Sequence, residues 1–208
     1  MVGEGVLLEC LENPAITEVL LVGRKPYPLQ HPKLKQAIAS DFMHLVDIEP
    51  QLAGFDACFY CAGISSVGMS EAEYTHITYD ITLNFAETLA RLNSQMTFIY
   101  VSGVSTDSTE KGRVMWARVK GRTENALARL PFRAEYNFRP GLMKPTPFQR
   151  NIKGFYNVIG WLYAPLHILT PNFVSTLKDV AVAMIKAAQS GYEKNILEVR
   201  DINALAKR

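Results

Sequence analysis

Glycines, small residues and cations follow each strongly apolar run of the chain. The runs and the residues after them are 18–22 with Gly23-Arg24, 55–61 with Ala62-Gly63, 96–101 with Ser102-Gly103, and 133–138 with Arg139-Pro140-Gly141. A short apolar run with such an end is typical of a strand buried in a parallel sheet. Because open α/β sheets bind ligands outside the carboxyl ends of their strands, we expect a ligand crevice where these four ends meet.

The first eleven residues predict a helix with no apolar strand ahead of it. In a dinucleotide-binding unit the order is a strand, a glycine-rich turn and a helix whose first amides hold the pyrophosphate. Gly3 fits the last glycine of such a turn. The alternative is an ordinary surface helix with Val6, Leu7 and Leu11 as its buried stripe. The apolar run at 18–24, which closes with a glycine and a cation, favours the first interpretation.

Strand and helix signals alternate along the rest of the chain. Besides the runs above, we expect strands at 35–39 and 196–199, and helices at 48–52, 71–92, 114–130 and 176–189. This alternation predicts an α/β fold, a Rossmann-type doubly wound and mainly parallel sheet with helices on both faces. We expect residues 1–208 to form a single domain, in which 142–172, rich in proline and aromatic residues, is an irregular subregion that covers the cleft.

The composition excludes several classes of protein. Lys and Arg number 22 and Asp and Glu 20, so the net charge is +2, and no block of like charge indicates nucleic acid. No apolar run reaches the roughly 18 residues of a membrane span, since the nearest, 158–169, contains Pro165 and His167. We expect no membrane span, and the lack of a leader segment makes a cytoplasmic location the simplest expectation.

The three cysteines and four histidines predict neither a disulfide nor a metal site. Cys58 and Cys61 have CxxC spacing but lie in an expected strand, where residues three apart point to opposite faces about 10 Å apart. A disulfide needs Cα atoms within about 7 Å. The histidines have no metal-ligand spacing with the cysteines, and an odd number of cysteines fits a reducing compartment.

Together these segments resemble the atypical short-chain dehydrogenases/reductases, near the Tat-interacting-protein and NAD-dependent epimerase/dehydratase-like branch. The resemblance covers nearly all 208 residues. Its carriers are Met1-Val2-Gly3, Val22-Gly23-Arg24, Cys61-Ala62-Gly63, Tyr100-Val101-Ser102-Gly103, Lys120 and Arg139-Pro140-Gly141. It implies an NAD(P)-binding domain whose cofactor residues are Gly3, Arg24, Lys25, Asp41, Phe42, Ala62, Gly63, Lys120, Arg139, Pro140 and Gly141.

The tip of the second strand indicates which dinucleotide is preferred. NAD-binding proteins of this fold carry an acid there for the ribose hydroxyls, whereas NADP-binding proteins place a cation near the 2′-phosphate. This chain has Arg24 and Lys25 and no acid. We therefore expect NADP rather than NAD, with a solvated basic turn as the alternative. Asp41-Phe42 resembles the family's adenine-edge position.

The expected reaction centre departs from the family's pattern. The resemblance implies a tyrosine that acts as acid or base, a lysine four residues later and an orienting serine. Lys120 fits the lysine, but Trp116 stands at the tyrosine and Gly103 at the serine. An indole has no exchangeable acid near neutral pH. Ser102 and Ser105, with the neighbouring Thr106 and Asp107, are the hydroxyls and acid left to orient a substrate, while Tyr79 fits a packed residue better than a substitute acid.

Two functions remain open at this point. The first is an oxidoreductase or epimerase that acts on a small carbonyl or sugar-like substrate. The second is a catalytically impaired protein that senses NADP(H) and presents 142–172 to a protein partner. Trp116 and Gly103 favour the second function, whereas Lys120 indicates only that a cofactor is bound.

A missing first strand would leave a slot in the sheet. In the strand order 3-2-1-4-5-6 the absent strand belongs between 19–22 and 55–61. Ladder bonds and buried side chains of one strand amount to about 10 kcal/mol, comparable with the stability of a whole domain. We therefore expect this chain to be unstable alone, and either residues upstream of Met1 or a rearrangement or another chain to fill the slot.

Overall fold

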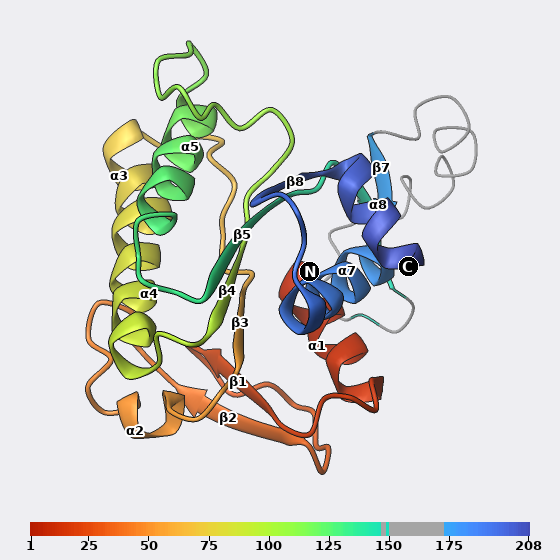
Figure 1. The fold of residues 1–208 in the computed structure, drawn as a ribbon. Coiled ribbons are helices and arrows are strands. Elements are labelled where there is room, and N and C mark those ends of the chain that lie inside the picture. The colour runs from red at the N-terminus through yellow and green to blue at the C-terminus, as the bar shows by residue number, and fades with distance from the viewer. Residues whose placement is uncertain (147–148, 150–172) are drawn as a thin grey trace.

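The computed structural model describes residues 1–146, 149 and 173–208. A parallel sheet lies between two layers of helices (Figure 1). One layer holds α3 (Glu71–Thr75), the π-helical turn η1 (His76–Asp80), α4 (Ile81–Leu92) and α5 (Met115–Leu127). The other holds α1 (Val2–Glu12), α7 (Leu177–Ser190) and α8 (Val199–Lys207). This is the Rossmann-type α/β fold predicted from the sequence.

All recorded strand pairs are parallel. The central sheet has the order β3-β4-β5-β8, formed by Ala57–Tyr60, Thr97–Val101, Ala134–Arg139 and Ile196–Glu198. A second pair consists of β1 (Val19–Gly23) and β2 (Leu34–Ile38), with the short helix α2 (Glu49–Leu52) after it. A third joins β6 (Leu142–Lys144) to β7 (Val174–Thr176). The predicted strands therefore occur close to their expected positions.

The sheet is interrupted between β1 and β3. In the described part of the chain β1 pairs only with β2, and β3 pairs only with β4. All five residues of β1 are only half-buried, whereas the first four residues of β4 are buried. The slot expected between 19–22 and 55–61 is therefore present.

Alternation along the central strands divides the core into two halves. Ile99 of β4 faces the layer of α1, α7 and α8, where Phe138, Leu177 and Met184 are fully buried. Phe98 and Tyr100 point to the opposite face, toward α4. Successive residues of a strand point to opposite faces, so one strand supplies both halves. Leu127 of α5 is buried in this second half of the core.

Local signals define the helix ends. Thr176 and Asp179 form a capping box at the start of α7, and Gly191 ends that helix with φ 71°. Ser70 and Glu73 form a capping box at the start of α3. Reciprocal side-chain caps of this kind satisfy backbone N–H groups that have no partner within the helix.

Three expectations about the elements need correction. The helix expected at 71–92 is continuous in direction but contains the π-helical turn at His76–Asp80. The strand expected at 196–199 ends at Glu198, and the chain continues as α8, which the sequence analysis missed. In the expected irregular subregion 142–172, Leu142–Lys144 forms a strand. Residues 147–148 and 150–172 of that subregion lie outside the described residues.

Gly121 gives a test of how tightly the loop after β4 packs on α5. A Cβ atom at Gly121 would lie 1.8 Å from the backbone oxygen of Asp107, so Gly121→Ala forces the two segments apart. We expect the free energy of unfolding to fall by about 1–3 kcal/mol, since overpacking outweighs the roughly 1 kcal/mol that alanine gains over glycine in a helix. Urea denaturation measures the change. Gly63→Ala is the matched control, because its Cβ would meet nothing within 4 Å. A Gly121→Ala protein as stable as this control would contradict the packing.

Candidate functional site

The carboxyl ends of β3, β4 and β5 lie together at one edge of the sheet. Their registers place Tyr60 beside Tyr100 and Val101 beside Phe138. Beyond the strands, the Ser102 amide donates to the Phe138 carbonyl at 2.8 Å and the Val104 amide to the Pro140 carbonyl at 3.1 Å. These bonds keep the segments aligned after the ladder itself has ended.

Two glycines leave open space at this edge. An added Cβ at Gly63 or Gly103 would meet no atom within 4 Å. Ala62 and Gly63 are exposed. The backbone is therefore accessible to a ligand above the ends of β3 and β4.

The start of α1 lies beside the end of β3. A Cβ at Gly3 would be 3.3 Å from Cβ of Cys61, so Gly3 lies next to the expected crevice. A second close approach of α1 occurs at Gly5. A Cβ there would be 2.3 Å from Cδ2 of the fully buried Leu177.

A buried acid ties α1 to the loop after β1. The Tyr27 hydroxyl donates to Oε1 of Glu4 at 2.7 Å, and Glu4 is buried in the first turn of the helix. The Gln36 side chain holds the backbone of Tyr27 by two hydrogen bonds. Its oxygen accepts from the Tyr27 amide and its nitrogen donates to the Tyr27 carbonyl, both at 2.9 Å. The sequence analysis missed Glu4. An acid in the first turn of a helix was the only signal that could have found it.

The two cations at the tip of β1 are exposed. Neither Arg24 nor Lys25 has an ion-pair partner among the described residues. The two hydrogen bonds between Gln36 and the Tyr27 backbone fix the loop just after Lys25. Both charges are therefore available to an anion.

Asp41 and Phe42 lie on the loop after β2. Oδ1 of Asp41 accepts from the Met43 amide at 2.8 Å, and Oδ2 lies 2.8 Å from Nδ1 of His44. These hydrogen bonds, the amide first, hold the pKa of Asp41 below its usual value. The Phe42 ring packs on Phe85 with 5.7 Å between centroids, and Asn84 donates to the Phe42 carbonyl. The loop is therefore anchored to α4.

Lys120 projects from α5 toward the end of β4. Its Nζ donates to the carbonyls of Ser102 at 3.2 Å and Val101 at 3.4 Å, and to the Tyr100 hydroxyl at 3.5 Å. Burial lowers the pKa of Lys120 to about 8, with Glu124 opposing the shift. The amine therefore lies at the carboxyl end of β4.

The hydroxyls beyond β4 divide into an internal and an exposed group. Oγ of Ser102 lies 2.9 Å from Oγ1 of Thr106, which donates to the Gly103 carbonyl at 2.8 Å. Both of these side chains are buried. Ser105 is exposed and has φ 68°, in the left-handed region that non-glycine residues rarely adopt. Such strain occurs often at functional sites, so Ser105 is the better placed of the two serines to contact a ligand.

Among the residues that the structure describes, none of the aromatic side chains near Lys120 is a good proton donor. Trp116 lies one turn before Lys120, half-buried, and lines a cavity of about 160 Å³ with Ser105 and Asp107. Tyr79 packs against Arg122, whose guanidinium carbon lies 4.3 Å from the ring centroid. Tyr100 is the phenol beside Lys120, a contact that the sequence analysis missed. It is 1% exposed, and burial raises its pKa well above the usual value.

Arg139 is engaged inside the protein. Its Nε and Nη2 donate to the two carboxylate oxygens of the buried Glu124, and Nη1 donates to Glu198 at 3.1 Å. Nη2 also donates to Oγ of Ser108 at 2.6 Å. Its neighbour Gly141 faces Phe173, whose carbonyl oxygen would be 2.3 Å from an added Cβ. The 139–141 turn is therefore packed, with Arg139 directed at α5 rather than outward.

Comparisons with known proteins show the fold. No protein-family profile matches the chain, and no curated protein matches it. Several solved structures are similar to the chain. The UDP-N-acetylglucosamine 4-epimerase of Bacillus cereus has a TM-score of 0.66 and 16% identity, over 98% of this chain and 79% of that one. The dTDP-glucose 4,6-dehydratase DesIV of Streptomyces venezuelae, with NAD and TYD bound, has a TM-score of 0.67 and 15% identity, over 99% and 76%.

A third similar structure is the WbmF enzyme of Bordetella bronchiseptica in complex with NAD⁺. Its TM-score is 0.65 at 13% identity, over 99% of this chain and 73% of that one. All three similarities extend over nearly the whole chain. They establish a Rossmann fold of the type found in these epimerases and dehydratases.

Two further findings concern the described residues alone. None of their helices combines the length and the apolar character that crossing a bilayer requires. No group of three or more His, Cys, Asp or Glu side chains among them could hold a metal ion.

The lowered pKa of Lys120 predicts a pH-dependent contribution to stability. The folded lysine loses its proton near pH 8, whereas the unfolded lysine keeps it to about 10.5. Between these values the unfolded state binds more protons, so this group makes the protein more stable as pH rises. We expect the difference in unfolding free energy between wild type and Lys120→Met to shift in favour of wild type from pH 8 to 10.5.

Denaturant titration at several pH values measures this difference. The buried thiols and phenols, whose pKa values are raised, have the opposite slope, but they are common to both proteins and cancel. Lys120→Arg is the matched control, because its guanidinium stays charged over the whole range. A constant difference between wild type and Lys120→Met would contradict the burial of the amine.

Proposed function

We propose that this chain binds a nicotinamide dinucleotide at the carboxyl edge of its sheet. The observation that carries the proposal is the convergence of Lys120 with the open backbone at Gly63 and Gly103. The start of α1 at Gly3 lies beside this edge, so helix amides are near the place where a pyrophosphate would bind. Ala62, Gly63 and Lys120 would contact the cofactor, with Asp41 and Phe42 toward its adenine end. Pro140 and Gly141 would border it beyond β5.

NADP rather than NAD is the cofactor that we propose. Arg24 and Lys25 lie at the tip of β1 and are exposed, without ion-pair partners among the described residues. A 2′-phosphate would offer them a charge-assisted contact. Two of the similar structures named above, those of WbmF and DesIV, contain NAD, so the preference for NADP rests on this chain's own cations.

For the chemistry, we propose an oxidoreductase or epimerase that acts on a small carbonyl or sugar-like substrate. The bound dinucleotide would supply hydride transfer. Within the chain, Lys120 would hold the cofactor's ribose, and Ser105 and Ser102 would orient the substrate's carbonyl. The sugar-nucleotide enzymes among the similar structures support this class of substrate.

A second candidate is an NADP(H)-sensing protein whose chemistry is impaired, and Trp116 favours it. Proton transfer needs an acid or base within hydrogen-bond reach of the substrate. The indole cannot serve, Tyr79 packs on Arg122, and Tyr100 is buried with a raised pKa. In this case the protein would bind the cofactor and present a surface to a protein partner.

The cofactor preference is tested by titrating the protein with NADPH and NADH. A charge-assisted contact is worth about 1.5–3 kcal/mol, so NADPH should bind roughly ten to a few hundred times more tightly. Arg24→Ala should remove most of this difference. Arg200→Ala is the control, since Arg200 is an exposed cation on α8. Equal affinity of the wild type for both dinucleotides would contradict the assignment.

The two candidate functions are separated by restoring the missing groups. We expect wild-type turnover of simple aldehydes and ketones with NADPH to be close to background, because no exposed phenol adjoins Lys120 in the described part of the chain. This result would favour the second candidate function over the first. The double variant Trp116→Tyr with Gly103→Ser should raise this turnover. Gly103→Ser alone is the control, as it restores the orienting hydroxyl without the acid. Vigorous wild-type turnover that survives changes at Ser102 and Ser105 would show that the reaction centre lies elsewhere.

A further inference from the structure

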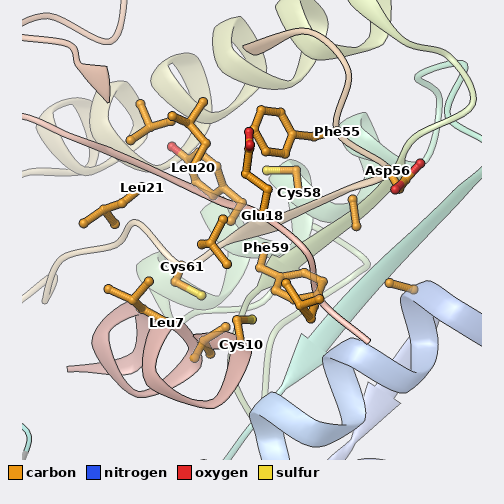
Figure 2. A pocket seen from close by; sticks show the side chains of 18 of the residues that line it. Leu7, Cys10, Glu18, Leu20, Leu21, Phe55, Asp56, Cys58, Phe59 and Cys61 are labelled. Carbon is orange, nitrogen blue, oxygen red and sulfur yellow. The ribbon is translucent and has the colours of Figure 1, made fainter. Parts of the chain in front are cut away.

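Two cavities of the described structure differ in kind. The one in Figure 2 measures about 990 Å³ and lies in the slot between β1 and β3, with Leu20 and Phe59 among the side chains around it. It belongs to the interrupted sheet. The other measures about 160 Å³ and lies at the amino end of α5, where Val114 and Trp116 line it. This smaller cavity lies outside the sheet.

The smaller cavity adjoins the candidate site. Ser105 lines it from the loop after β4, just beyond Ser102, whose carbonyl accepts from Lys120. Trp116 lines it from α5, one helical turn before Lys120. A ligand in this cavity would therefore lie beside the position proposed above for the cofactor's ribose.

Hydrogen bonds hold the walls of this cavity together. The Asp107 amide donates to the Ala117 carbonyl at 3.1 Å, which ties the loop after β4 to α5. The Gly112 amide donates to Oδ2 of Asp107 at 2.6 Å, and the Arg118 guanidinium donates to the Gly112 carbonyl at 2.7 Å. The cavity is therefore formed without a ligand, and a ligand need not order the loop when it binds.

The lining of the cavity is mainly apolar, and its polar groups suit an uncharged ligand. The lining residues are Ser105, Asp107, Gly112, Arg113, Val114, Trp116 and Ala117. Both carboxylate oxygens of Asp107 already accept hydrogen bonds, from Thr109 and from Gly112. The positive charge of the exposed Arg113 and the negative charge of Asp107 favour neither an anion nor a cation.

The same lining does not suit a sugar. Ser105 offers a hydroxyl at the cavity, but Asp107 is engaged and the remaining surface comes mostly from Val114, Trp116 and Ala117. A polyhydroxylated ring would leave most of its hydroxyls without partners there. Burying a polar group without a hydrogen bond costs free energy, so an apolar group is favoured.

The size of the cavity fits one planar ring. An apolar cavity of about 150 Å³ holds benzene, and this cavity measures about 160 Å³. Trp116 is only half-buried, so part of its indole can be contacted. Aromatic rings attract each other in offset-stacked or edge-to-face arrangements. Val114, which is 51% exposed, would be covered by such a ring.

We propose that this cavity binds the uncharged planar ring of a carbonyl substrate, which packs against Trp116 with its carbonyl oxygen toward the Ser105 hydroxyl. The identity of the reacting carbonyl rests on the proposed function, and the inference narrows that function to substrates that carry an aromatic ring. Binding of the ring itself requires no dinucleotide, because every lining residue belongs to the loop after β4 or to α5.

Binding of benzyl alcohol to the whole chain, without dinucleotide, tests the proposal. This probe is uncharged and carries an oxygen one carbon from its ring. The readout is the indole N–H signal of Trp116 in two-dimensional NMR spectra, assigned by its loss in Trp116→Phe. We expect a saturable shift with a Kd on the order of 1 mM, which is typical of so small a ligand. Glucose at the same concentrations should leave the signal unchanged.

One substitution at two exposed valines locates the ring. Val114→Phe places a side chain in the cavity, and we expect it to weaken binding of benzyl alcohol by roughly tenfold or more, because the two rings compete for the same space. Val67→Phe is the matched control. Val67 is 88% exposed and does not line this cavity in the described structure, so the affinity should stay that of the wild type.

Three results would overturn the proposal. Equal affinity of Val114→Phe and Val67→Phe would mean that the ring binds elsewhere. Glucose that shifts the Trp116 signal as strongly as benzyl alcohol would identify a polyol site. The absence of a saturable shift would mean that no ring enters. The NADPH titration described above is a separate measurement, so ring binding without NADPH binding would support the ring site while it contradicts the proposed cofactor.

Discussion

The buried ion pair between Arg139 and Glu124 fixes α5 on the sheet, and the candidate site depends on it. Glu124 is 2% exposed on its side chain, and both of its oxygens accept from the guanidinium. Removing one partner of such a pair leaves a buried charge without compensation, which costs about 3–5 kcal/mol. Lys120 lies one helical turn before Glu124. Any shift of α5 along β5 would therefore move the amine away from the end of β4.

Helix α5 carries both the residue best placed to bind a ligand, Lys120, and the residue that replaces the expected acid, Trp116. Lys120 is held by three oxygens at the end of β4, which suits a residue that positions a ligand. Trp116, one turn earlier, borders a small cavity with Ser105 and Asp107 but offers no titratable proton. Binding and proton transfer are therefore separable here. The described residues include groups for binding but no evident group for proton transfer.

The sequence predicted the parts of this fold that depend on local pattern. Apolar runs closed by glycine or small residues predicted the strands, and open backbone at Gly63 and Gly103 agrees with their expected place at the sheet's edge. Contacts between segments that are distant in the sequence could not be predicted from local pattern. Tyr100 meets Lys120 only because β4 packs under α5, and Arg139 turns inward because Glu124 lies above it. The close approach of Gly5 to Leu177 of α7 was also beyond prediction, since it depends on where the two helices cross.

The π-helical turn at His76–Asp80 sets the rotational phase of the long helix. It contains the bond from the Ile81 amide to the His76 carbonyl, five residues back. Each residue of an α-helix turns the chain by about 100°, so deleting one residue here would rotate α4 by that angle relative to α3. The turn also presents the Thr78 carbonyl to the Thr123 hydroxyl of α5, 3.5 Å away. The π-helical turn therefore fixes the position of α5 relative to the long helix. Sliding of α5 along that helix would break this contact.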